Sequence, residues 1–174
     1  MMPDALAGEQ FESVAQVPWL EARKDPLRSE LVIQGRARLF PSMRQVKDTL
    51  RATVRIGYDG RVHKTFRGPN AAERFATEVK VLQHLETVNC PFVPRLVENH
   101  PDELRIVTTA CGSRVEHLDA ERAKELFDEL ETYGVRHDDA DIRNVTYRQT
   151  DGRFCLIDFE FATILPGFDN VANG

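Results

Sequence analysis

The stretch His137-Asp138-Asp139-Ala140-Asp141-Ile142-Arg143-Asn144 is the most informative part of this sequence. It is followed by Leu156-Ile157-Asp158-Phe159-Glu160, and Asp151-Gly152 between the two segments is a typical hairpin turn. The pattern predicts a polar loop, then a strand, a turn, and a second strand that ends in an acid. Oxygen atoms are the donors that Mg²⁺ prefers, and the two segments carry them on Asp139, Asn144 and Asp158.

Size and composition indicate an ordinary globular chain. Its 174 residues allow one domain, or one two-lobed unit, with a sizeable core. The net charge of −5 argues against a broad nucleic-acid surface. A long apolar run and a basic leader are both lacking, so we expect neither a membrane span nor a secretory signal. Cys90, Cys111 and Cys155 have no paired spacing, which predicts buried free thiols, a reducing compartment and a cytoplasmic location.

Hydrophobic patterning predicts an α+β fold. Alternating β-forming residues indicate strands at residues 49–56, 61–67, 95–99 and 104–110. The turn Gly57-Tyr58-Asp59-Gly60 joins the first two strands into an antiparallel hairpin. Residues 41–48 are expected to form a loop, and residues 1–30 an N-terminal extension.

Two helices are expected between and after these strands. Asn70 as N-cap, with Glu73 three residues later, resembles a capping box, and this helix should run to about Glu86. Asp119 caps the second helix and Gly134 is placed to end it. The apolar face of the second helix is expected to carry Ala123, Leu126, Phe127 and Leu130.

Two charged residues fall on faces that should be apolar. Period-2 alternation places Lys64 on the same strand face as Val62 and Phe66. Glu78 falls within the helical stripe of Phe75, Val79, Leu82 and Leu85. Since a buried charge without a partner is costly, we predict that Lys64 and Glu78 form an ion pair inside a cleft.

In order along the chain, Lys64, Glu78, the H-x-D-x-x-x-x-N loop and the Asp158-Phe159 site resemble the active-site elements of the protein-kinase-like superfamily. The resemblance covers roughly residues 50–165 and is nearest to minimal kinases of the lipopolysaccharide-sugar kinase, RIO and Bud32 types. It implies a two-lobed fold: an antiparallel N-lobe sheet with the αC helix over residues 31–110, and a truncated C-lobe over residues 111–174.

The resemblance also implies a role for each site residue. Lys64, held by Glu78, contacts the α- and β-phosphates of ATP, while Asn144 and Asp158 bind Mg²⁺. Asp139 orients the acceptor hydroxyl and accepts its proton, and His137 braces the loop. The hinge near Thr108–Ser113 contacts adenine through backbone groups, and the nucleotide-binding positions there are Thr109, Ala110 and Cys111.

The sequence departs from the kinase pattern at several places. Glu160 replaces the glycine of D-F-G, which predicts a loop held in one state and a further carboxylate near the metal. No glycine-rich loop precedes the hairpin, so side chains such as Ser42, Arg44 or Lys47 are the candidate substitutes. No A-P-E element follows Asp158, which argues against a conventional peptide-substrate groove.

The function expected from these residues is an ATP- and Mg²⁺-dependent phosphotransferase acting on a hydroxyl acceptor, with protein serine or threonine among the candidates. Carboxylates of Asp138, Asp139 and Asp141 favour a neutral or cationic acceptor, unless Arg136 and Arg143 offset them. The alternative functions are a pseudokinase-type nucleotide-binding scaffold or sensor, and an ATPase that works with a partner protein. A partner protein that supplies the missing lobe also remains open.

Overall fold

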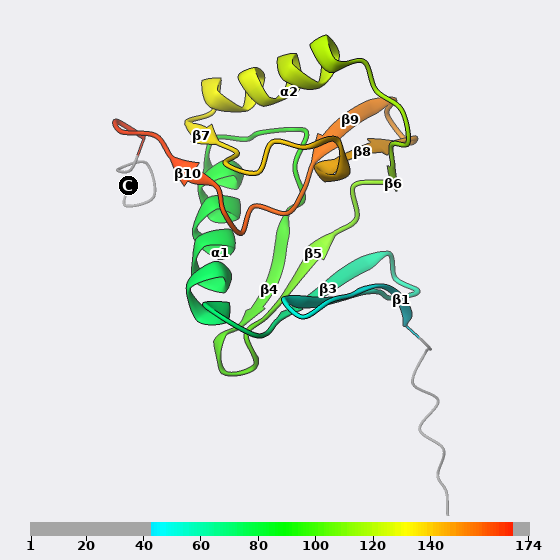
Figure 1. Cartoon of the computed structure of the whole chain (residues 1–174), viewed down its shortest axis with the longest axis vertical. Coiled ribbons are helices and arrows are strands. Elements are labelled where there is room, and N and C mark those ends of the chain that lie inside the picture. The colour runs from blue at the N-terminus through cyan, green and yellow to red at the C-terminus, as the bar shows by residue number, and fades with distance from the viewer. Residues whose placement is uncertain (1–42, 169–174) are drawn as a thin grey trace, which may run out of the picture. The chain divides into compact units, whose positions relative to one another are not determined.

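The structure, a computed structural model, describes residues 43–168, which form an α+β fold with an antiparallel five-stranded sheet and two helices (Figure 1). The strands of the sheet lie in the order β1-β2-β3-β5-β4. Their bounds are β1 Arg44–Asp48, β2 Ala52–Ile56, β3 Arg61–Phe66, β4 Leu96–His100 and β5 Arg105–Thr109. The predicted hairpin and the two later strands are therefore confirmed. The expected extension over residues 1–30 lies outside the described residues.

The two faces of the central strand β3 differ in burial: Lys64 and Phe66 on one face are buried, whereas Arg61, His63 and Thr65 on the other are exposed or half-buried. Lys64 pairs in register with Val54 of β2 on one side and with Ile106 of β5 on the other. Because successive side chains of a strand point to opposite faces, Lys64 shares its face with apolar neighbours, as the alternation predicted.

The expectation of a loop over residues 41–48 is wrong for its described part, because Arg44–Asp48 forms strand β1 and pairs antiparallel with β2. The register shifts between Gln45 and Lys47, which leaves Val46 as the extra residue of a β-bulge. The strand is mostly exposed and lacks clean alternation. Its pairing with β2, rather than a local hydrophobic pattern, makes it a strand.

The two helices begin and end close to the predicted residues. Helix α1 spans Ala71–Thr87, but its N-cap Asn70 has φ 55° and makes no side-chain hydrogen bond to the first turn. The expected capping box is therefore wrong, since a capping side chain needs the extended backbone that Asn70 lacks. Helix α2 spans Ala120–Thr132, and the side chain of Asp119 accepts hydrogen bonds from the first-turn amides, as predicted.

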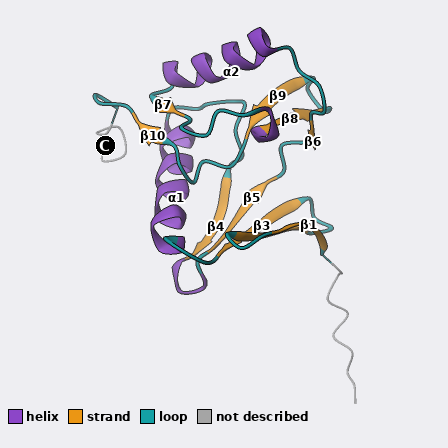
Figure 2. Ribbon diagram, in the orientation of Figure 1, coloured by secondary structure: helices purple, strands orange, loops and turns teal. Residues whose placement is uncertain are grey.

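The described part of the chain after β5 contains helix α2 and five short strands joined by loops (Figure 2). A three-stranded sheet has the order β6-β8-β9, with β6 Ser113–Arg114, β8 Val145–Arg148 and β9 Arg153–Leu156. The predicted turn at Asp151-Gly152 joins β8 to β9. A second pair joins β7 Val135–Arg136 to β10 Thr163–Ile164. A 3₁₀ turn, Ile142–Asn144, precedes β8.

One hydrophobic core joins these parts. It includes Leu82 and Leu85 of α1, Leu130 of α2, Leu156 of β9, and Phe159 in the loop after β9. This packing holds the loop after β9 against the sheet and α1, which brings distant polar residues together. The three cysteines are buried and free, as predicted. No helix within residues 43–168 is long and apolar enough to cross a membrane.

Candidate functional site

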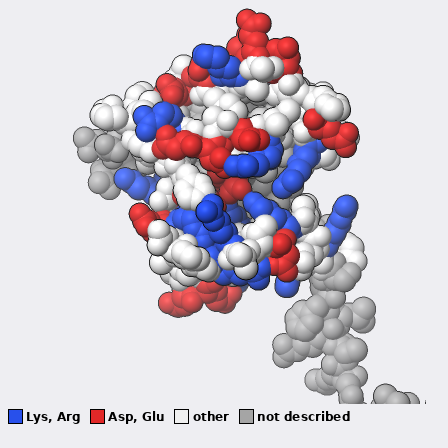
Figure 3. Space-filling model, in the orientation of Figure 1, with Lys and Arg blue, Asp and Glu red and all other residues white. Residues whose placement is uncertain are grey.

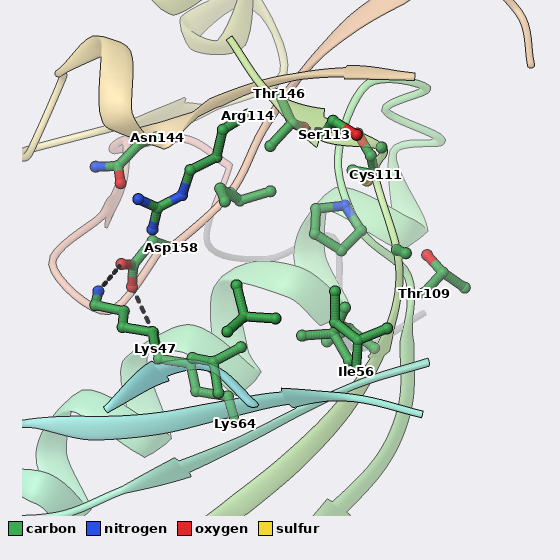
Figure 4. A pocket seen from close by; sticks show the side chains of 18 of the residues that line it. Lys47, Ile56, Lys64, Thr109, Cys111, Ser113, Arg114, Asn144, Thr146 and Asp158 are labelled. Atoms are coloured by element: carbon green, nitrogen blue, oxygen red, sulfur yellow. Dashed lines mark hydrogen bonds and ion pairs between the residues drawn. The ribbon is translucent and has the colours of Figure 1, made fainter. Parts of the chain in front are cut away.

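A cavity of about 340 Å³ is lined by the five-stranded sheet, helix α1 and the segments from Ala110 to Asp158 (Figure 4). This volume is in the range of small-molecule sites. Aliphatic side chains line much of it: Val46, Val54, Ile56, Val62, Ile106 and Ile157. Figure 4 shows the charged groups of Lys47, Arg114 and Asp158 at one end, and Ile56 and Thr109 at the other. The cavity is therefore apolar at one end and charged at the other.

The charged end contains the predicted ion pair. Nζ of Lys64 lies 2.6 Å from Oε2 of Glu78, and the two residues are 7% and 5% exposed. Burial raises the pKa of Glu78 to about 7, although the ammonium of Lys64 opposes this shift. Burial also disfavours a charged Lys64, but the carboxylates of Glu78, Asp158 and Glu160 raise the pKa of this lysine above its usual value. Lys64 is therefore positively charged at neutral pH.

Asp158 lies beside this pair and is held by two lysines. Lys64 donates a hydrogen bond to Oδ1 of Asp158, and Nζ of Lys47 lies 3.3 Å from Oδ2. Burial works against ionisation of Asp158, but the two lysines outweigh it and lower its pKa to about 2. The backbone of Asp158 has φ 69°, an unusual conformation for a residue with a side chain. Strained backbone of this kind often occurs at functional sites.

Glu160 is buried, and it completes a network that the sequence did not predict. Its Oε2 lies 3.1 Å from Nζ of Lys64 and 3.1 Å from Nη1 of Arg74. Arg74 of α1 is 4% exposed. The signal was present in the sequence, because Arg74 lies one residue before Phe75 and four before Glu78, on the buried face of the helix. The left-handed backbone falls on Asp158 instead of Glu160.

The loop after β7 positions Asp139 beside the cavity but not on its wall. Nη2 of Arg143 lies 2.5 Å and 2.8 Å from the two carboxylate oxygens of Asp139. Nδ2 of Asn144 donates to the backbone oxygen and to Oδ2 of Asp139. The hydrogen bond from Arg143 is the main reason why the pKa of Asp139 is below its usual value. Asp139 is thus an ionised carboxylate held in one orientation.

His137 braces this loop, as the sequence suggested. Its Nε2 lies 3.1 Å from the carbonyl oxygen of Ile157, and the amide of Asp139 donates to its Nδ1. The ring packs against Phe127 and Phe159. His137 is 4% exposed and joins the Asp139 loop to the segment that carries Asp158.

The connection from β5 to β6 forms the wall at the less charged end. Thr109, Ala110 and Cys111 line the cavity there. Oγ1 of Thr146 donates a hydrogen bond to the backbone oxygen of Cys111, which holds the connection against β8. Gly112 has φ 88°, and a Cβ atom at this position would clash with the carbonyl oxygen of Tyr147. The chain therefore needs glycine at this close approach.

The charge of the cavity differs in sign from that of the chain. Five cationic residues line it, Arg44, Lys47, Lys64, Arg114 and Arg143, whereas the anionic lining residues are Glu78 and Asp158. The lining residues thus carry a formal charge of +3 in a chain with net charge −5, and the carboxylates of Glu160 and Asp139, which contact Lys64 and Arg143 from outside the lining, offset part of it. Lysines and arginines also gather over the five-stranded sheet in the lower half of the face in Figure 3. A local positive potential of this kind attracts anionic ligands.

Most of the residues predicted from the sequence meet at this cavity. Those on its wall are Lys64, Glu78, Thr109, Ala110, Cys111, Asn144 and Asp158, while Asp139 lies behind Arg143 and Asn144. The sequence did not predict Arg74 and Arg114. Comparison with protein-family models and with curated proteins finds no match.

Proposed function

We propose that this protein is an ATP- and Mg²⁺-dependent phosphotransferase of the protein-kinase-like superfamily, which transfers the γ-phosphate to a hydroxyl acceptor. One observation carries the proposal. Lys64 of the sheet, Glu78 of α1 and Asp158 after β9 meet at the charged end of an otherwise apolar cavity. This is the set of groups with which kinases hold nucleotide phosphates and metal.

The two ends of the cavity suit the two ends of a nucleotide. Val54, Val62 and Ile106 offer an apolar surface for a purine ring, and the backbone of Thr109–Cys111 offers hydrogen-bonding groups beside it. Lys64 supplies a cation for the phosphates, and Glu78 holds that cation in place. The local positive charge favours a polyphosphate over a neutral ligand.

Asn144 and Asp158 fit a magnesium ion by the chemistry of their donors, since Mg²⁺ prefers carboxylate and carbonyl oxygens together with substrate phosphates. Asn144 donates from its side-chain nitrogen Nδ2 to Asp139, and this leaves its side-chain oxygen Oδ1 for other partners. Oxygen atoms of Glu78, Asp158 and Glu160 also lie within 4.8 Å of one another, although Lys64 bonds all three carboxylates. A bound metal would neutralise phosphate charge during transfer.

Asp139 is the group proposed to orient the acceptor. Arg143 and Asn144 hold its carboxylate ionised and in one orientation, which suits a group that positions the acceptor hydroxyl. Catalysis in this class comes mainly from positioning and charge neutralisation. Asp138 pairs with Arg136, and Asp139 and Asp141 pair with Arg143. The loop's negative charge is offset to that extent, so it gives little discrimination against anionic acceptors.

A second candidate is a nucleotide-binding scaffold or sensor without transfer activity. It is favoured by the pairing of Asp139 with Arg143 and by the two lysines on Asp158, which together cover the carboxylates that transfer would use. An ATPase that acts with a partner protein would share the cavity but use water as the acceptor.

Thermal unfolding with ATP tests the nucleotide site, and labelled-phosphate transfer tests the chemistry. Binding raises the free energy of unfolding by about 2.7 kcal/mol at a hundredfold excess over Kd, so saturating Mg²⁺-ATP should raise the melting temperature of the full chain. The magnesium dependence should disappear in Asp158→Asn, which keeps the shape but removes an anionic ligand. Asp102→Asn, at an exposed position of the turn Pro101–Glu103, is the matched control because it makes the same chemical change away from the cavity.

Transfer separates the two candidate functions. Asp139→Asn should abolish phosphate transfer and ATP hydrolysis yet keep the thermal shift, since Asp139 acts on the acceptor and not on ATP. Nucleotide binding without turnover in the wild-type chain, across sugar, small-molecule and protein acceptors and water, would support the scaffold instead. A melting temperature unmoved by Mg²⁺-ATP and by ATP alone would reject both.

A further inference from the structure

Strand β1 occupies the place in the chain where a glycine-rich phosphate loop would be expected. Residues 43–56 contain no glycine, so the backbone there cannot approach a phosphate as closely as glycine allows. The β-bulge at Val46 changes the direction of the side chains, and both Val46 and Lys47 line the cavity. Bulges commonly redirect a side chain beside a functional site. Here the bulge places a lysine at the charged end.

Lys47 is held less firmly than Lys64. Its Nζ lies 3.3 Å from Oδ2 of Asp158, and its side chain remains 35% exposed. Lys64 is bonded to Oδ1 of the same carboxylate and is 9% exposed. Because Lys64 already compensates the charge of Asp158, Lys47 can leave this carboxylate without stranding a buried charge.

Arg114 reaches the same end from another element. It belongs to β6, lines the cavity and extends toward Asp158 (Figure 4). No hydrogen bond or ion pair joins its guanidinium to another residue within 43–168. Arg143 on the same wall is already paired with Asp139. Arg114 is therefore an exposed cation beside the cavity whose guanidinium has no protein partner within residues 43–168.

We propose that Lys47 and Arg114 together bind the terminal phosphates of the nucleotide, in place of the backbone of a glycine-rich loop. The inference rests on the proposed function and adds the residues that recognise the polyphosphate. A lysine supplies a mobile point charge, and an arginine supplies a planar fork that matches phosphate oxygens. When Lys47 moves from Asp158 to a phosphate, Oδ2 of Asp158 becomes available as a ligand. Nucleotide binding would thus free the carboxylate of Asp158, which is proposed to bind Mg²⁺.

The alternative is that Lys47 serves only to neutralise Asp158, and Arg114 only to keep the surface charged. The two explanations differ in how the effect of a substitution depends on the number of phosphates in the nucleotide. If Lys47 and Arg114 form a phosphate clamp, their loss weakens the binding of ATP more than that of AMP. If they have only a structural role, their loss affects the binding of all nucleotides alike through the stability of the fold.

Calorimetric titration of the full chain with ATP, ADP and AMP tests the clamp. Lys47→Gln and Arg114→Gln should each weaken ATP binding about tenfold or more, the equivalent of losing one charge-assisted hydrogen bond. AMP binding should change less than about twofold. Lys47→Arg keeps the charge and should recover most of the ATP affinity. Arg114→Lys keeps the charge but loses the planar fork, so it should recover only part of the affinity.

Arg55→Gln is the matched control, because Arg55 is exposed and lies between the lining residues Val54 and Ile56, on the other face of β2. It removes the same charge without touching the cavity and should leave ATP affinity unchanged. Wild-type binding of ATP that neither glutamine variant weakens, or an equal loss for ATP and AMP, would overturn the clamp and leave the nucleotide site intact. A wild-type chain that binds none of the three nucleotides would overturn both proposals.

Discussion

Replacing Arg74 with methionine should destabilise the fold strongly, although Arg74 is not among the residues predicted to bind nucleotide or metal. Nη1 of Arg74 lies 3.1 Å from Oε2 of Glu160, and its guanidinium also donates to the backbone oxygens of Arg51, Arg67 and Pro69. One side chain thus links α1, the loop before it, the start of β2 and the segment after β9. Methionine keeps much of the volume but removes every donor.

The expected loss follows from the burial of this network. Arg74 is 4% exposed and Glu160 is 8% exposed, so removal of the arginine leaves a buried carboxylate with Lys64 as its remaining cation. Breaking a buried ion pair from one side costs about 3–5 kcal/mol. In a chain of this size, each kcal/mol lowers the melting temperature by roughly 2–4 °C. Arg74→Met should therefore lower the melting temperature by roughly 6–20 °C.

Urea unfolding of four variants measures the pair itself. The double variant Arg74→Met/Glu160→Met should be more stable than the sum of the two single changes predicts, with a coupling of about 1–3 kcal/mol. Arg122→Met is the control, because its ion pair with Glu125 on α2 is exposed and should contribute less than about 1 kcal/mol. If the free energy of unfolding of Arg74→Met lies within 1 kcal/mol of the wild-type value, this network does not hold α1 to the loop after β9.

Two further predictions concern the backbone and the charge of the site. Gly112→Ala should lower the free energy of unfolding by about 3 kcal/mol or more, because the new methyl group would meet the carbonyl oxygen of Tyr147. Gly60 has φ 73° and open space around it, so Gly60→Ala should lower it by about 1–2 kcal/mol. Similar urea midpoints for the two variants would contradict this prediction. Asp158 has a pKa lowered from 3.8 to about 2, so its contribution of about 2 kcal/mol is present above pH 4 and is lost as the pH falls toward 2. The stability advantage of the wild type over Asp158→Asn should therefore shrink between pH 6 and pH 3, and a constant difference would show that the carboxylate is not stabilised by its lysines.

Much of the site could be predicted because its residues interrupt regular local patterns. Lys64 stands on an apolar strand face and Glu78 on an apolar helix face, so each needed a partner, and their Nζ and Oε2 atoms lie 2.6 Å apart. The polar loop from His137 to Asn144 was equally visible as a run of polar residues, and several of its hydrogen bonds are local, such as that from Asn144 to Asp139. These are inferences from neighbours in sequence, and local propensity and periodicity carry them.

Other features depended on contacts that no local pattern indicates. Strand β1 has an exposed, bulged sequence and becomes a strand through its pairing with β2. Asparagine is a preferred N-cap residue, yet the left-handed backbone of Asn70 leaves its side chain without a hydrogen bond to the first turn of α1. Propensity favours one conformation for such segments, and the packing of the chain around them selects another.

The sequence by itself determined the α+β class, the hairpin, both helices and the pairing of Lys64 with Glu78, because each depends on periodicity within a few residues or on the cost of an unpaired buried charge. Only the tertiary structure decided that Lys47 meets Asp158, 111 residues away, and that Arg74 meets Glu160, 86 residues away. Several acids could have partnered each of these cations. The core around Leu82 and Phe159 selected the acidic partner of each cation, because it brings the loop after β9 against α1 and the sheet.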